Sequence, residues 1–325
     1  MVAGAAIGLF GAAFRANIIY ADGLRLTIIG TTRTHPAACA GAGLAVAFNA
    51  SVGGSVFVFE ELATSFTHDL LVATLGAATV AVAVMRALLG NRLDFLVRPG
   101  EALPQYTLVF FLVLGIFLGA LGALYNATIL AALNFCGRFV NIPTVARAAL
   151  IGAGFGLLSW FHPNIAGSDE AVTVTQGVFS NWVTVGTLPM VFLARFLIGP
   201  WSYAALTPGG LFSPLLLVGA TFGALFAAAL NYVVPTLGLP LVSFAVVGMV
   251  ALFAASVCAP LTGIVLAVEM TGRGDLILAM LAAALGAMVV ATLLKSPPIY
   301  VSLEDRTLAA AAPRSAAISV FRRAP

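Results

Sequence analysis

The stretch Gly209-Gly210-Leu211-Phe212-Ser213-Pro214 lies between two long apolar runs of the chain. Two consecutive glycines interrupt a helix and allow the backbone to approach a ligand closely. From Phe212 to Ala228 the sequence predicts a new helix with Pro214 in its first turn, where a missing N–H has no cost. A helix that begins inside a membrane presents unpaired N–H groups and the positive end of its dipole.

In lipid, such an irregular start is tolerated only where it is buried in protein or lines a cavity. A helix start of this kind favours an anion, so we expect an anion site at the glycine break. The alternative is an ordinary Gly-Gly loop at the membrane surface, and spacing alone does not separate the two interpretations.

The composition indicates a multi-pass membrane protein. Of the 325 residues, 61% are hydrophobic and only 8% are charged, which no ordinary soluble domain of this length shows. The net charge of +3 is small, and the basic residues lie in loops and at the C-terminus, which argues against nucleic-acid binding. We find no Ser/His/Asp, metal-ligand or phosphate-loop pattern, so we expect neither an enzyme nor a cofactor.

The expected helices differ widely in length, and many fall short of the roughly 20 residues that a perpendicular span needs. Short segments interrupted by glycine or proline are typical of transporters with a site at the membrane midplane. The predicted fold class is therefore all-α, with short, broken and re-entrant helices. The expected segments are Ala37 to Asn49, Ser51 to Ala63, His68 to Leu89, Tyr106 to Phe135, Ile142 to Trp160, Ser168 to Phe179, Trp182 to Leu197 (with Arg195 near its end), Phe212 to Val234, Pro240 to Ser256, Pro260 to Met270, Asp275 to Leu294 and Tyr300 to Ala311.

An internal repeat accompanies these broken helices. The sequence AVAFNASVGGSVFVFE at Ala45 to Glu60 aligns with AASVCAPLTGIVLAVE at Ala254 to Glu269, at an offset of 209 positions. Each copy reads as a small-residue helix, a break, and an apolar helix closed by a glutamate. The shared glycine and terminal glutamate favour a true repeat over chance similarity between two Ala/Val-rich helices.

These segments together resemble the CLC family of chloride channels and chloride/proton exchangers. The resemblance extends from Met1 to about Leu308 and implies a CLC-type inverted-repeat fold, a homodimer and a bacterial inner-membrane location. We expect a transmembrane domain at residues 1–312, and the positive-inside rule predicts that the short basic tail at residues 313–325 is cytoplasmic. The matching pieces are FNASVGGSVFVFEE (Phe48 to Glu61), PGGLFSP (Pro208 to Pro214), GMVALFAASVCAPLTGIVLAVEMTG (Gly248 to Gly272) and PPIYVSLEDRTL (Pro297 to Leu308).

The resemblance implies an anion site at the family's GxFxP motif, here Gly210 to Pro214. Family members hold a dehydrated chloride with two backbone amides of this motif, which correspond to Leu211 and Phe212. A tyrosine hydroxyl before the last helix also donates, and Tyr300 occupies that place. Amides and a phenol offer hydrogen-bond donors without a full positive charge, so that a bound anion can still leave.

Glu61 matches the family's internal proton-transfer glutamate, which exchangers carry and many channels replace. A carboxylate at the end of an apolar helix is costly and usually functional, although a helix end in water is the simpler interpretation. Its neighbour Glu60 either tunes Glu61 or faces solvent. Glu269, at the matching place in the second repeat, is expected to be structural.

The sequence also departs from the family. Neither of the motifs GSGIP and GREGP occurs in it, and the second holds the gating glutamate. We expect a truncated chain or a misassigned start, with the first repeat incomplete, rather than a degraded gene. The predicted function is chloride transport, as chloride/proton antiport in the intact form. The alternatives are a passive chloride channel and a non-transporting remnant, and the 325 residues alone are not expected to perform gated, proton-coupled transport.

Overall fold

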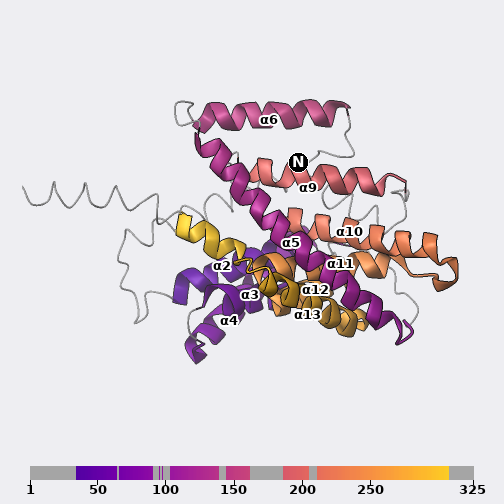
Figure 1. Cartoon of the computed structure of the whole chain (residues 1–325). Coiled ribbons are helices and arrows are strands. Elements are labelled where there is room, and N and C mark those ends of the chain that lie inside the picture. Colours follow the sequence, from indigo (N-terminus) through magenta and orange to yellow (C-terminus); the bar gives the residue numbers. More distant parts are fainter. Residues whose placement is uncertain are drawn as a thin grey trace, which may run out of the picture.

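The computed structural model describes residues 34–63, 66–90, 95, 97, 103–138, 144–161, 186–204 and 211–306, and these residues form helices and no strand (Figure 1). The helices are α2 (Thr34–Ala47), α3 (Ser51–Phe57), the π-helix η1 (Val58–Leu62), α4 (His68–Leu89), α5 (Thr107–Arg138), α6 (Thr144–Phe161), α9 (Leu188–Ala204), α10 (Phe212–Val233), η2 (Pro235–Leu237), α11 (Leu241–Val257), α12 (Pro260–Thr271), η3 (Gly274–Leu276) and α13 (Ile277–Leu293). Residues 299–306 form a last helical segment.

Most helices agree with the sequence-based prediction, and α4 has the predicted bounds. The clearest difference is α9, which begins later than Trp182 and continues past Leu197 through Pro200 to Ala204. Proline removes one hydrogen bond from a helix interior. Within a membrane protein this is tolerated where neighbouring helices or side chains satisfy the freed backbone carbonyl. Arg195 therefore lies in the middle of α9, and not near its end. The predicted segment Ser168 to Phe179 lies outside the described residues.

Four of the described helices are long and apolar enough to cross a membrane, which confirms the multi-pass class. These are His68–Leu89, Thr107–Arg138, Phe212–Val233 and Gly274–Leu293. The shorter α11 is apolar all round, and every side chain from Ser243 to Val257 is buried. A helix of this kind belongs at the centre of a protein, so α11 forms the core around which α5, α10, α12 and α13 pack.

Glycines bring the central helices into close contact. A Cβ atom on Gly119 of α5 would lie 2.6 Å from the Ala287 carbonyl oxygen of α13, and one on Gly122 would lie 2.6 Å from the Ala255 side chain of α11. Lipid tails are as apolar as the side chains, so helices associate in a membrane through such close backbone packing. Long α5, which runs obliquely across the molecule in Figure 1, is therefore fixed against both α11 and α13.

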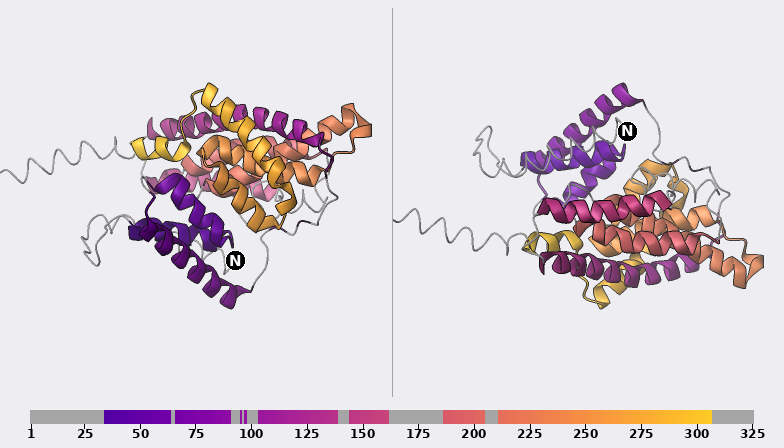
Figure 2. Two further views of the ribbon diagram at one scale, coloured as in Figure 1. Left: turned by 90° about the horizontal axis from the view of Figure 1, so that it is seen from below. Right: turned by 90° about the horizontal axis from the view of Figure 1, so that it is seen from above.

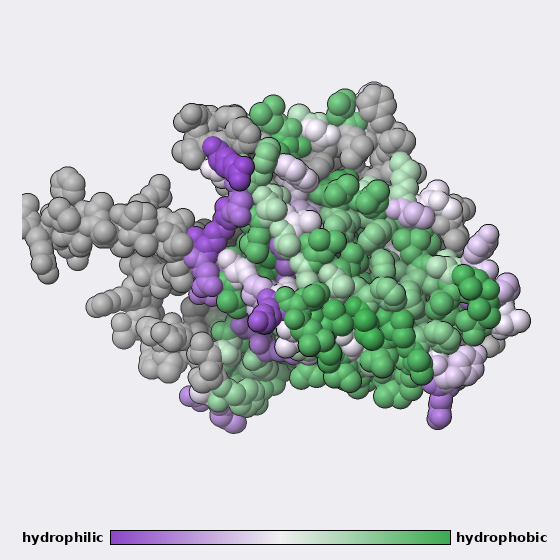
Figure 3. Space-filling view, viewed as in Figure 1, coloured by the Kyte–Doolittle hydropathy of each residue, from purple (hydrophilic) through white to green (hydrophobic). Residues whose placement is uncertain are grey.

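Helices α2, α3 and α4 form a smaller group along one side of the larger helix assembly (Figure 2). The main link between the two groups is α3, which packs against α12. The face shown in Figure 3 carries a broad apolar area with hydrophilic residues toward its edges, as expected for a protein surrounded by lipid.

Candidate functional site

The internal repeat is visible in the backbone. Asn49, which precedes α3, and Cys258, which precedes α12, both have positive φ, at 48° and 65°. The next residue, Ala50 (φ −129°, ψ 89°) or Ala259 (φ −119°, ψ 73°), has a similar backbone conformation in the two copies and precedes the helix without a side-chain cap. Residues other than glycine seldom adopt positive φ, so its recurrence at an offset of 209 confirms that the two copies share one backbone design.

Each copy caps the other through its terminal glutamate. The Glu269 carboxylate accepts hydrogen bonds from the amides of Val52 (3.2 Å) and Gly53 (2.7 Å), at the start of α3. The Glu60 carboxylate accepts from the amides of Leu261 (3.1 Å) and Thr262 (2.7 Å), at the start of α12.

These four amides occupy equivalent second and third positions of their helices, where an N-cap side chain normally accepts. Glu60 has one further donor, the Thr262 hydroxyl at 2.7 Å. The prediction that Glu269 is structural agrees with this contact. The sequence-based alternatives for Glu60, tuning Glu61 or facing solvent, did not include this contact with the start of α12. The donors to the Glu60 carboxylate lie 201 and 202 positions away in the sequence. The signal available in the sequence was the shared glutamate of the two repeats.

Glu61 lies in the π-helical turn η1, outside the four spans. The Ala63 amide donates to the Val58 carbonyl at 2.7 Å, which closes the wider turn. The equivalent position in the second copy is Met270, which is buried in a regular α-helix. Burial, followed by the neighbouring Glu60 charge, raises the pKa of the Glu61 carboxyl to about 7. A pKa this high leaves the Glu61 carboxyl partly protonated near neutral pH, unlike an ordinary glutamate carboxyl.

The predicted anion motif lies at the start of α10, which begins at Phe212 and contains Pro214 in its first turn. Leu211 precedes the helix with φ −78° and ψ −13°, and the side chains of both Leu211 and Phe212 are buried. Neither the Leu211 nor the Phe212 amide donates to another described residue. Gly210, the first residue of the motif, lies outside the described part of the chain. The helix start thus places two buried donors at a positive dipole end.

Aromatic side chains surround this helix start. The Phe212 ring lies 4.5 Å from that of Phe48, in the break before α3, and 4.6 Å from that of Phe253 in α11. The rings are tilted against each other and shield the region from solvent, which strengthens any electrostatic interaction with the two amides. Through Phe48 the first repeat contacts the start of α10.

Tyr300 lies at the beginning of the last helical segment and is half-buried. Its ring meets the edge of Phe57, the last residue of α3, with ring centroids 6.1 Å apart. The Tyr203 hydroxyl at the end of α9 and the Glu61 carboxylate both lie within electrostatic reach of the Tyr300 hydroxyl. Tyr300 therefore lies in one region with Glu61 and with the end of the helix that precedes the anion motif.

An internally repeated, all-helical membrane fold with broken helices is the architecture of an ion-transport protein. A family model described as voltage gated chloride channel matches residues 1–292. The chain belongs to this family, the CLC family, which confirms the resemblance noted from its motifs.

Among curated proteins, the chain is 37% identical over 278 residues to the H(+)/Cl(-) exchange transporter ClcA of Yersinia pestis bv. Antiqua (strain Angola), an alignment covering 83% of this chain and 57% of that protein. It is also 37% identical over 275 residues to ClcA of Cronobacter sakazakii (strain ATCC BAA-894), covering 83% and 58%. Among solved structures, a slow cyanobacterial Cl-/H+ antiporter matches with a TM-score of 0.78 and 33% identity, covering 86% of this chain and 65% of that one. The chain thus spans somewhat more than half the length of these curated relatives.

Proposed function

We propose that this chain serves chloride transport, coupled in the intact form to proton movement in the opposite direction. The observation that carries the proposal is the start of α10, where two buried amides stand unpaired with respect to the described residues. Its relatives named as H(+)/Cl(-) exchange transporters support the same assignment.

In the proposed anion site, the amides of Leu211 and Phe212 and the hydroxyl of Tyr300 donate to one chloride ion. Gly210 gives the backbone freedom to approach the ion, and Pro214 fixes the first helical turn. Neutral donors in a water-poor region bind an anion firmly enough to replace its hydration shell. Because they carry no full charge, they also release it.

Glu61 is the proposed proton carrier. Its raised pKa allows both protonation states near neutral pH, as a proton-transfer group requires. Its electrostatic proximity to Tyr300 brings the proton site near a proposed chloride ligand. A chloride ion bound at Tyr300 would repel the ionised Glu61 carboxylate. Chloride binding and the protonation of Glu61 would therefore influence each other, which is a physical basis for exchange. A passive chloride channel would not need such a group.

The test is a flux measurement with the full chain in liposomes. An outward chloride gradient is imposed, and proton movement is followed with an external pH electrode. Chloride efflux that drives proton uptake, with chloride flux but no proton uptake in the Glu61→Gln variant, would support the proposal. It would also overturn the expectation that the 325 residues alone do not perform gated, proton-coupled transport. Chloride flux without proton uptake by the unmodified chain agrees with the channel alternative, and equally with the expectation that these 325 residues alone do not couple the two ions. No chloride flux, together with no chloride binding by calorimetry, indicates a non-transporting remnant.

We also propose that two copies of the chain associate in the membrane, as the family resemblance implies. The mass of the detergent-solubilised protein, measured by light scattering with correction for bound detergent, tests this. A mass equal to one chain at all protein concentrations contradicts it.

A further inference from the structure

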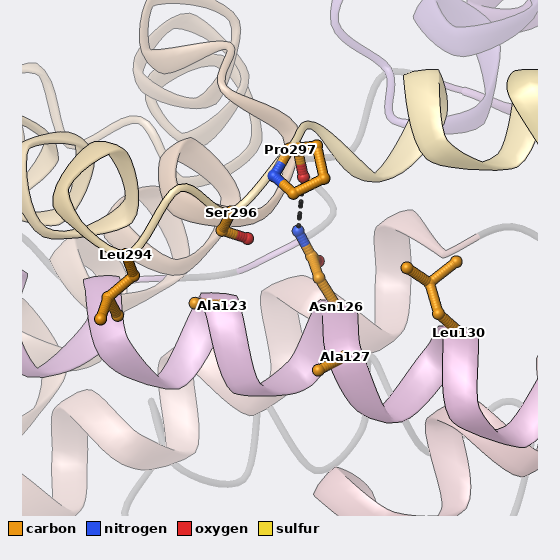
Figure 4. Close-up of a pocket in the computed structure, with 7 residues that line it drawn as sticks. All are labelled: Ala123, Asn126, Ala127, Leu130, Leu294, Ser296 and Pro297. Carbon is orange, nitrogen blue, oxygen red and sulfur yellow. Dashed lines mark hydrogen bonds between the residues drawn. The ribbon is translucent and has the colours of Figure 1, made fainter.

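One buried asparagine connects three separate parts of the chain. Asn126 lies on α5 and is 3% exposed. Its side-chain nitrogen donates to the Ser256 carbonyl oxygen at the end of α11 (3.0 Å) and to the Pro297 carbonyl oxygen (3.4 Å). Pro297 belongs to the linker between α13 and the last helical segment. Figure 4 shows the Asn126 side chain pointing from α5 toward this linker.

The linker is also held on either side of Pro297: the Ser296 amide donates to the Ala291 carbonyl (3.0 Å), and the Pro298 carbonyl accepts from the Ser302 amide (3.1 Å). Proline at 297 and 298 gives it no backbone N–H at two consecutive positions, so its carbonyl oxygens are its main hydrogen-bonding groups. Tyr300 follows Pro297 by only three residues. Ile299 between them is fully buried, which restricts sideways movement. The position of the Tyr300 hydroxyl along α5 therefore depends on where the Pro297 carbonyl is held.

The far end of the last helical segment is also attached to α5. The Arg306 guanidinium donates to the Asn134 side-chain oxygen. Asn126 and Asn134 are eight residues apart on α5, about 12 Å along the helix axis, and residues 299–306 cover a similar length. The last segment and α5 thus lie side by side in the same direction, with a contact at each end.

An open pocket lies beside the Asn126 contact. Its volume is about 230 Å³, and α5 and the linker form its walls. Its lining residues are Ala123, Asn126, Ala127, Leu130, Leu294, Ser296 and Pro297 (Figure 4). The pocket leaves room for a shift of Pro297 once the Asn126 hydrogen bond is lost, while the Ser296 amide still donates to the Ala291 carbonyl (3.0 Å).

We propose that Asn126 is a positioning residue for the Tyr300 hydroxyl, and that it sets chloride affinity without contacting the ion. Asn126 holds the Pro297 carbonyl and thereby fixes the height of Tyr300 relative to the start of α10. This inference rests on the proposed function, because it takes Tyr300 to be a chloride ligand. It adds a residue on α5 that the anion motif itself does not contain.

The first test compares Asn126→Leu with the unmodified chain by calorimetric titration of chloride into chloride-free protein. We expect chloride affinity to fall about threefold to tenfold, the usual worth of a lost hydrogen bond. The matched control is Asn231→Leu. Asn231 exchanges two hydrogen bonds with Leu239 (2.9 and 2.8 Å) at the opposite end of α10. We expect its replacement to lower stability to a comparable degree and to leave chloride affinity unchanged.

The second test uses Asn126→Asp, for which a merely structural role predicts no pH-dependent change in chloride affinity. Burial favours the neutral carboxyl, whose O–H donates to the Pro297 or Ser256 carbonyl, whereas the ionised form has no donor and repels both oxygens. We expect chloride affinity, relative to the unmodified chain at each pH, to be nearly normal in acid and to fall as pH rises. Asn126→Leu shows no such change.

The outcomes separate the two proposals. If the unmodified chain binds no chloride, the proposed function fails. If it binds chloride, and Asn126→Leu and Asn126→Asp bind it equally well at every pH, the positioning role fails while the proposed function stands.

Discussion

Glu60 and Glu269 hold each other's repeats: the carboxylate of each accepts hydrogen bonds from the first-turn amides of the short helix that belongs to the other copy. Four donors that would be unpaired at two helix starts are satisfied in this way. The negative charge also lies at the positive end of each dipole. The exchange joins α3 to α12, and therefore joins the smaller helix group to the larger one.

The first prediction concerns the stability that these caps provide. Replacing Glu269 with alanine removes two hydrogen bonds, and we expect a loss of about 1–2 kcal/mol, as for other helix caps. Glu60→Ala should cost more, since the Thr262 hydroxyl also loses its acceptor. Thermal unfolding in detergent provides the measurement. The exposed Glu304 is the matched control, and its replacement with alanine should leave the melting temperature unchanged. Equal melting temperatures for all three variants would contradict the capping role.

The second prediction concerns the crossing of α5 and α13. A Cβ atom on Gly119 would lie 2.6 Å from the Ala287 carbonyl oxygen and 2.7 Å from the Val290 Cβ, so the helices must separate. We expect Gly119→Ala to destabilise the protein by about 1–3 kcal/mol. Gly76 in α4 has no atom within 4 Å of its Cβ position. Gly76→Ala should therefore be neutral, or stabilising by up to about 1 kcal/mol through helix propensity. Similar melting temperatures for the two variants would show that the α5–α13 contact tolerates added volume.

Much of this arrangement could be predicted from the sequence, because apolar run length and glycine placement act locally. The repeat at Ala45 and Ala254 predicted the two broken helices, and Pro214 predicted the start of α10. The π-helical turn at Val58–Leu62 could not be predicted, since it depends on how the end of α3 meets other helices. The contact of Asn126 with Pro297 joins positions 171 residues apart, and a single asparagine in an apolar run gives no sign of its partner.

The third prediction tests the Leu211 amide directly. The φ angle of Leu211 is −78°, which proline can adopt, so Leu211→Pro removes the N–H with little change in the backbone. If this amide donates to chloride, affinity should fall about tenfold or more, because hydrogen bonds to charged groups are the stronger ones. Leu211→Ala keeps the amide and removes the buried side chain, and we expect near-normal affinity. Titration calorimetry compares the two. A larger loss for alanine than for proline would assign the effect to packing.

The fourth prediction concerns the Tyr300 hydroxyl. Tyr300→Phe keeps the ring and its edge contact with Phe57, and removes one donor. We expect chloride affinity to fall roughly tenfold, with little change in melting temperature. The Tyr106 ring is exposed, and Tyr106→Phe serves as the matched control with no expected effect. Unchanged affinity for Tyr300→Phe would exclude its hydroxyl as an anion ligand while leaving the two amides in place.

The last prediction concerns pH. Burial, and then the Glu60 charge, raise the pKa of the Glu61 carboxyl to about 7, so it is protonated in acid and ionised above neutral pH. The infrared carboxyl band of Glu61, identified by its loss in Glu61→Gln, should therefore titrate with a midpoint near pH 7. Glu60→Gln removes the repelling charge, so the midpoint should move to lower pH. It should stay above the ordinary glutamate value, because burial is the larger cause. Glu269→Gln removes a charge from the other repeat and should not move it. A midpoint near pH 4.5 in the unmodified chain would leave Glu61 ionised at neutral pH, and a proton route through it would then need another donor.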